Sequence, residues 1–96
     1  MIKHIVCFKL NDSSEEQKRA AKDILMSMNG NVPQIRSIEV GTDFLCSPRS
    51  YDVILQVTLD DPDALDAYQQ DPYHCEVVKA YMHKNAASSV ALDYSL

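Results

Sequence analysis

Hydrophobic and polar residues alternate along four short stretches of the chain, and they recur at helical spacing in two segments between them. The alternating stretches are residues 2–10, 33–43, 51–59 and 88–96. Alternation with a period of two predicts β-strands, whereas apolar residues three and four positions apart predict amphipathic helices. The chain therefore reads strand–helix–strand–strand–helix–strand.

Both helical segments begin with ordinary start signals. Ser13 or Ser14 opens a capping box before the first segment, which stops at Gly30. Asp61 suits the N-cap of the second segment and Pro62 its first helical position. A further proline, Pro72, disfavours helical conformation in the residue before it, so we expect this segment to consist of two helices with a break between them.

This order of elements predicts a single α+β domain over residues 1–96 with the ferredoxin-like βαββαβ arrangement. Both helices would cover one face of a four-stranded antiparallel sheet. The other face would carry a second set of apolar residues, namely Ile5, Cys7, Ile38, Val40 and Ile54. Such a face favours an isologous homodimer formed through the sheet.

Composition narrows the classes of function. The net charge is −5 and the basic residues are scattered, which argues against nucleic acid as a partner. No apolar run approaches the roughly 20 residues that span a bilayer, and the start of the chain lacks a signal peptide. The three cysteines show no metal-binding spacing, so we expect a cytoplasmic protein without a metal or other cofactor.

Two motifs resemble those of the stress-responsive A/B barrel family, whose domains form dimeric α/β barrels. The first is Lys3-His4-Ile5-Val6-Cys7-Phe8-Lys9 in the first strand. The second is Asp63-Ala64-Leu65-Asp66-Ala67-Tyr68 followed by Asp71-Pro72-Tyr73-His74. The resemblance covers essentially the whole chain in order and spacing. It implies the fold and the dimer more than it implies a reaction.

In a plant member of that family, a polyketide cyclase that closes a ring by aldol condensation, the catalytic tyrosine and histidine match Tyr68 and His74. The resemblance also places His4 in the ligand pocket. A further pocket histidine of that cyclase aligns with Val53, which puts the cyclase substrate in doubt for this chain.

The residues themselves support two interpretations of the Tyr68/His74 pair. Imidazole can act as a general base near neutral pH, and a tyrosine hydroxyl can donate to a developing oxyanion. Alternatively, His74 caps the second helix and Tyr68 fills the core. His4, Phe8 and Val53 face the helices and would either line a pocket or belong to the core, whereas we expect a structural or exposed role for His83.

Three hypotheses for function remain open at this point. The first is a homodimer that binds a small hydrophobic or polyketide-like ligand, with or without acid–base catalysis. The second is a non-catalytic stress or scaffold dimer with a filled core. The third is a monooxygenase of the dimeric α/β barrel type, although only the presence of histidines favours it. A cavity of roughly 300 Å³ or more beside His74 would favour the first hypothesis over the second.

Overall fold

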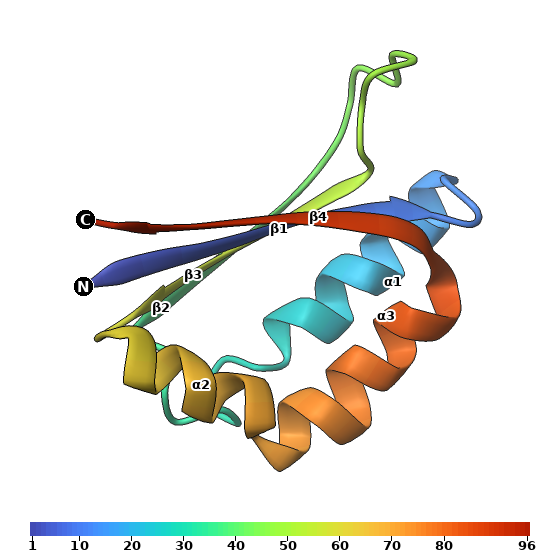
Figure 1. Ribbon diagram of the computed structural model, residues 1–96. Helices are drawn as coiled ribbons and strands as arrows, with labels where there is room; N and C mark the ends of the chain where they lie inside the picture. Colours follow the sequence, from blue (N-terminus) through green and yellow to red (C-terminus); the bar gives the residue numbers. More distant parts are fainter.

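The computed structural model describes residues 1–96 and shows a sheet with helices on one side (Figure 1). The strands are β1 (Ile2–Leu10), β2 (Ser37–Thr42), β3 (Val53–Leu59) and β4 (Ala86–Ser95). The helical elements are α1 (Glu15–Met26), α2 (Pro62–Gln70), the π-helical turn η1 (His74–Lys79) and α3 (Ala80–Asn85). The ferredoxin-like arrangement predicted from the sequence is confirmed.

The four strands form one antiparallel sheet in the order β2-β3-β1-β4. Strand β1 is therefore central and pairs with both β3 and β4, while β2 and β4 are the edges. The two termini lie side by side at one end of the sheet, where the Leu96 N–H donates to the Met1 carbonyl over 2.9 Å (Figure 1).

Local signals in the sequence determine where the helices begin. The Ser14 hydroxyl accepts a hydrogen bond from the Gln17 N–H at 3.3 Å, and the Asp61 carboxylate accepts one from the Ala64 N–H at 2.8 Å. Both N-cap predictions are thus confirmed, since each side chain satisfies an N–H group that the helix itself leaves free. Five strand boundaries differ from the prediction: β2 begins at 37 rather than 33, β3 at 53 rather than 51, and β4 at 86 rather than 88, while β2 and β4 each end one residue earlier, at 42 and 95.

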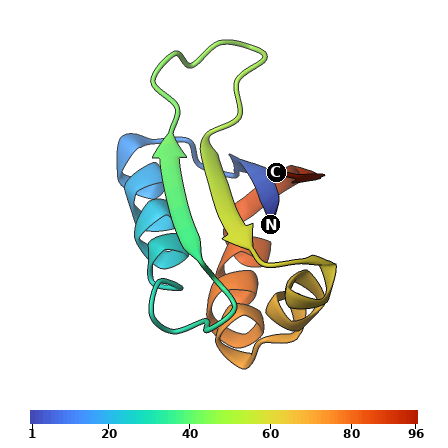
Figure 2. The same cartoon turned by 90° about the vertical axis from the view of Figure 1, so that its left-hand side faces the viewer.

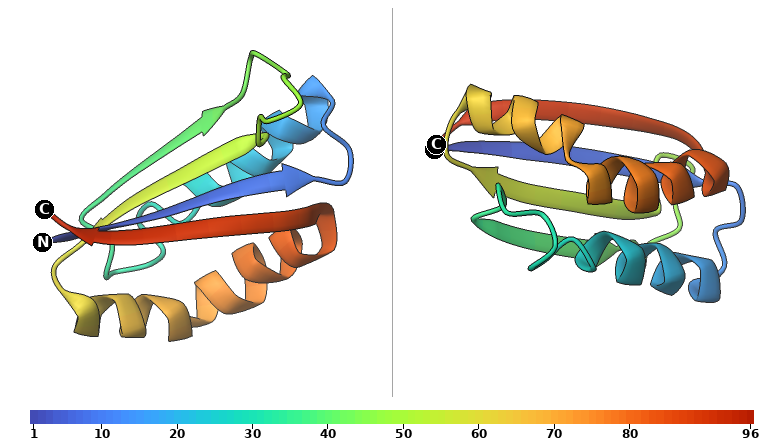
Figure 3. Two further views of the ribbon diagram at one scale, coloured as in Figure 1. Left: turned by 45° about the horizontal axis from the view of Figure 1, so that its top comes forward. Right: turned by 90° about the horizontal axis from the view of Figure 1, so that it is seen from below.

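The break predicted at Pro72 is present. Helix α2 ends at Gln70, and Asp71 has an extended ψ of 131°. One Asp71 carboxylate oxygen then accepts hydrogen bonds from the Tyr73 and His74 N–H groups, at 2.9 and 3.2 Å. Asp71 with Pro72 thus repeats the start signal of Asp61 with Pro62, and it changes the direction of the chain between α2 and the segment that holds His74 (Figure 3).

The helices divide the covered face of the sheet between them. Helix α1 lies under β2 and β3, and the rod formed by α2, η1 and α3 lies under β1 and β4 (Figure 3). Residues of α1, of the turn after it and of β3 form most of the deeply buried core: Ala21, Leu25, Met28, Val32, Val53, Leu55, Val57 and Leu59. Tyr68 and Val78 on the other side are buried to the same extent.

The open face of the sheet differs in part from the prediction. Residues paired directly across an antiparallel sheet share a face, and Ile38 and Val40 pair with Val57 and Leu55, which are buried under the helices. The assignment of Ile38 and Val40 to the open face was therefore wrong, because the faces of β2 depend on its register with β3. The apolar open face instead comprises Ile5, Cys7, Ile54, Val90, Leu92 and Tyr94.

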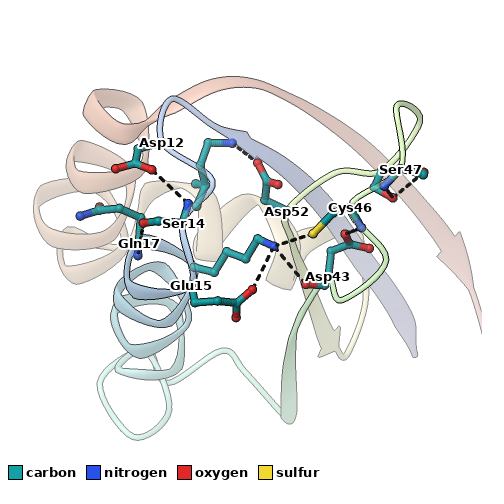
Figure 4. Close-up of polar contacts among 11 residues, drawn as sticks. Asp12, Ser14, Glu15, Gln17, Asp43, Cys46, Ser47 and Asp52 are labelled. Atoms are coloured by element: carbon teal, nitrogen blue, oxygen red, sulfur yellow. Dashed lines mark hydrogen bonds and ion pairs between the residues drawn. The ribbon is translucent and has the colours of Figure 1, made fainter.

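A long loop, residues 43–52, connects β2 and β3 and extends beyond the sheet on the side away from the helices (Figures 1 and 2). The buried Lys18 of α1 donates a hydrogen bond from its Nζ to the Asp43 carbonyl oxygen at 3.1 Å, and Cys46 Sγ lies 3.6 Å from the same nitrogen (Figure 4). One lysine thus ties α1 to the base of this loop.

None of the helices combines the length and the apolar character that crossing a membrane requires.

Candidate functional site

A cavity of about 620 Å³ lies between the sheet and the rod formed by α2, η1 and α3. Its floor is formed by β1 and β4, with Leu55 of β3 and Leu25 of α1 at the inner end. Ten of the 17 residues that line it are hydrophobic. A volume of this size and a mostly apolar lining are typical of sites for small organic molecules.

His74 lies at the first turn after the proline break and faces this cavity. Its side chain is 9% exposed, and its Nδ1 has no hydrogen-bond partner in the protein. Burial, together with the positive charges of Lys79 and His4, lowers the pKa of His74 below its ordinary value of 6.5. A neutral imidazole is thus present near pH 7, and its buried Nδ1 has no hydrogen-bond partner.

Tyr68 lies beneath His74 in the last turn of α2. Its ring centroid is 4.4 Å from that of His74, with 31° between the planes, so the two rings are stacked rather than hydrogen bonded. The Tyr68 hydroxyl lies 3.7 Å from the sulfur of Met28, within the core, and burial raises its pKa. Tyr68 therefore holds the ring of His74 in place, and its hydroxyl does not reach toward His74.

The third aromatic ring of the site belongs to His4. His4 is buried on the helix-covered face of β1, and its Nδ1 is hydrogen bonded to the carboxylate of Asp93, the residue directly opposite it on β4. Its ring meets the ring of Tyr68 edge-on, with centroids 5.6 Å apart. A carboxylate on one ring nitrogen orients an imidazole and leaves the other nitrogen for proton transfer.

The structure brings four of the five predicted site residues to one cavity. His74, Tyr68, His4 and Phe8 all line it. Val53 does not: it is buried in the core, and Leu55 is the residue of β3 that lines the cavity. The alternative in which the His74 side chain caps its helix is wrong, because Asp71 provides that cap.

Three residues near the cavity were not recognised from the sequence as parts of a site. Asp93 was missed because only the register of β1 with β4 places it opposite His4. Lys79 and His83 line the outer part of the cavity and are exposed to solvent. Their spacing of four residues, which places two side chains on one face of a helix, is the signal that would have linked them.

No group of three or more histidine, cysteine or carboxylate side chains is arranged to hold a metal ion. The chemistry that the site itself offers is therefore proton transfer and hydrogen bonding by two imidazoles, beside an apolar space.

Solved structures define the class to which this fold belongs. A dimeric ferredoxin-like protein of unknown function from Thermobifida fusca superposes with a TM-score of 0.83 at 27% identity, over 99% of this chain and 90% of that one. A dimeric protein of unknown function with a ferredoxin-like fold from Bacteroides fragilis gives 0.80 at 27% identity, over 99% and 95%.

A match along nearly the whole chain identifies the family. The stress responsive A/B barrel domain matches residues 2–96, and the chain belongs to that family. The uncharacterized protein SCO4036 of Streptomyces coelicolor is 31% identical over 97 residues, which cover 98% of each chain. The resemblance noted in the sequence is confirmed.

Proposed function

We propose that this protein binds a small, mainly apolar organic molecule in the cavity between the sheet and the α2–η1–α3 rod. The observation that carries this proposal is the free Nδ1 of His74, because a buried polar atom without a partner is costly and calls for one. The adjoining space of about 620 Å³ is large enough for a bicyclic compound or a medium-length chain. A scaffold protein would have no need of such a space.

The two histidines also support acid–base chemistry on that molecule. A neutral His74 can accept a proton from an acidic C–H group, and His4, oriented by Asp93, can exchange a second proton. Aldol ring closure of a poly-β-ketone requires such a pair of transfers, and it matches the reaction implied by the family resemblance. In this scheme Tyr68 is a positioning residue, since its hydroxyl points to Met28.

Two neutral probes, decanamide and 2-naphthamide, test binding. We expect either probe to shift the imidazole NMR signals of His4 and His74, which both line the cavity. Replacement of Ala91, a small cavity-lining residue, by leucine should remove these shifts. Shifts that persist in Ala91→Leu would place the binding elsewhere and contradict the proposal.

Heptane-2,4,6-trione tests the chemistry, because its aldol cyclisation with loss of one water gives a methylresorcinol. A general base commonly contributes about 10²–10⁴-fold in rate, so His74→Ala should reduce the formation of this product at least about 100-fold. Val77→Ala, at an exposed position of the same turn, is the control and should leave the rate unchanged. Equal rates in the wild type and His74→Ala would contradict the role of His74 as the base and leave the binding proposal in place.

We further propose that two copies associate through the open face of the sheet. Three side chains of the edge strand β4 protrude there, with Val90, Leu92 and Tyr94 exposed by 50%, 62% and 43%. The loop of residues 43–52, which extends on the same side of the sheet (Figure 1), contains Phe44, which is 91% exposed. Such an apolar surface is typical of an interface, and the dimeric relatives with this fold support the same assembly.

Leu92→Asp tests the interface. An unpaired charge buried between two copies costs about 3–5 kcal/mol, which should convert a dimer into a monomer by light scattering. Val77→Asp is the matched control, because Val77 is an exposed apolar residue on the helical side of the molecule. A mass that is unchanged by Leu92→Asp would contradict the proposed face. The cytoplasmic location expected from the cysteines remains a prediction.

A further inference from the structure

All three histidines and one lysine of this acidic protein line one cavity. The chain has a net charge of −5 and three histidines, and all three histidines line the same cavity. Lys79 lines it as well, whereas none of the 17 lining residues is an aspartate or a glutamate. The cavity thus has the opposite electrostatic character to the molecule as a whole.

Two carboxylates close to these histidines are already engaged. Asp93 is hydrogen bonded to His4, and Asp71 accepts two hydrogen bonds from the backbone of the turn that it caps. Neither Lys79 nor His83 forms an ion pair within the protein. The ammonium and imidazole groups at the outer end of the cavity are therefore available to a ligand.

The position of these groups distinguishes the two ends of the cavity. Lys79 and His83 lie four residues apart at the junction of η1 and α3, which places them on one face of the helix, and both are exposed. His74 lies at the inner end, where it is 9% exposed. A bound molecule would thus meet a solvated cationic group at one end and a buried, free imidazole nitrogen at the other.

We propose that the ligand is an organic anion, with a carboxylate or a similar oxygen group between Lys79 and His83 and an apolar body that extends to His74. This inference rests on the proposed binding function and adds the class of ligand to it. An acidic protein repels anions at long range, so a preference for them must come from local contacts. A charge-assisted hydrogen bond from the Lys79 ammonium and a hydrogen bond from the His83 imidazole are contacts of the required kind.

The test compares three forms of one molecule: decanoate, decanamide and decylammonium. A rigid pair, 2-naphthoate and 2-naphthamide, repeats the comparison with a different shape. Dissociation constants are measured from the imidazole signals of the three histidines during NMR titration. We expect each carboxylate to bind at least about tenfold more tightly than its amide, and decylammonium to bind most weakly.

Variants locate the anionic group. Lys79→Gln and His83→Gln should each weaken binding of decanoate and leave that of decanamide unchanged, so that the double variant loses the tenfold preference. Lys84→Gln is the matched control, because Lys84 is an exposed lysine of the same helix that does not line the cavity. It should retain the full preference.

The outcomes separate this inference from the proposed function. Equal affinity for decanoate and decanamide would overturn the anion preference while the binding function stands. A preference that survives the Lys79/His83 double variant would overturn the placement of the anionic group. If no member of the panel shifts the histidine signals, both proposals are overturned.

Discussion

The two halves of the helix-covered face follow the same alternation of residues but differ in how they are filled. Under α1, the inward side chains of β3 are large and nearly inaccessible: Val53, Leu55, Val57 and Leu59. Under η1 and α3, the corresponding inward positions of β4 are small or polar: Ala87, Ser89, Ala91 and Asp93. One half is a core and the other a cavity.

The difference arises from side-chain volume, not from the backbone. Strands β3 and β4 are both paired with β1 in a regular antiparallel register, apart from a shift near Leu10, so the backbone supports both halves in the same way. Protein interiors are normally packed to the density of organic crystals. A row of alanine and serine on the inner side of β4 leaves space that α3 does not fill.

The largest contrast should appear when one large residue is removed from each half. Leu59→Ala should lower the free energy of unfolding by about 2–5 kcal/mol, because Leu59 is fully buried and its removal opens a new void. Met82→Ala should cost only about 1–2 kcal/mol, since Met82 already borders an existing space. Urea denaturation measures both, and equal losses would contradict the contrast.

The half under α1 also contains Lys18, which connects α1 to the loop of residues 43–52. Lys18→Met keeps the length of the side chain but removes the hydrogen bond to the Asp43 carbonyl. We expect faster trypsin cleavage after Arg49, within the freed loop, than in the wild type. Lys22→Met, an exposed change on the same helix, is the control. An unchanged cleavage rate would show that other contacts hold the loop.

The half with the cavity should be the more sensitive to acid. The pKa of His74 is lowered in the folded state, so as the pH falls below the ordinary value of 6.5 the unfolded chain takes up a proton first. The contribution of His74 to stability is therefore complete above pH 6.5 and is lost as the pH falls toward its folded pKa. His74→Gln should show a smaller loss of stability between pH 7.5 and about 5 in urea titrations. An equal loss would assign the acid sensitivity to other groups.

The smallest effect on stability should come from filling the cavity. Ala91→Leu adds three carbon atoms to an inward position of β4 that borders open space, so the free energy of unfolding should change by less than about 1 kcal/mol. The same variant should no longer bind decanamide or 2-naphthamide. A large loss of stability would show that the space is too narrow for a side chain and would weaken the case for a ligand.

The sequence predicted the fold because its signals are local. Alternation indicated the strands, and Asp61, Pro62 and Pro72 marked the helix boundaries that the structure shows. The error over Ile38 and Val40 has a different origin. Which face these two residues occupy depends on their pairing with β3, whose partner residues lie 19 and 15 positions further along the chain, and no local pattern determines that register.

The candidate site could likewise be predicted where local patterns place its residues, and not where it depends on contacts between distant segments. Alternation in β1 placed His4 and Phe8 on the helix side, and the proline break placed Tyr68 and His74 close together. The partnership of His4 with Asp93 depends on the pairing of strands at opposite ends of the chain. The contact of the Tyr68 hydroxyl with Met28 depends on how α1 packs, and hydrophobic patterning does not describe such contacts.

The π-helical turn at His74–Lys79 has a consequence for insertions and deletions in this family. A π-turn holds one residue more per turn than an α-helix, so deletion of a single residue from it would leave an ordinary helix rather than a broken one. Because the extra residue is accommodated within this one turn, the residues on both sides of the deletion would keep nearly the same directions. A relative one residue shorter at this point would therefore keep the fold and the directions of the side chains on either side, which makes this turn a place where the chain can gain or lose one residue at little structural cost.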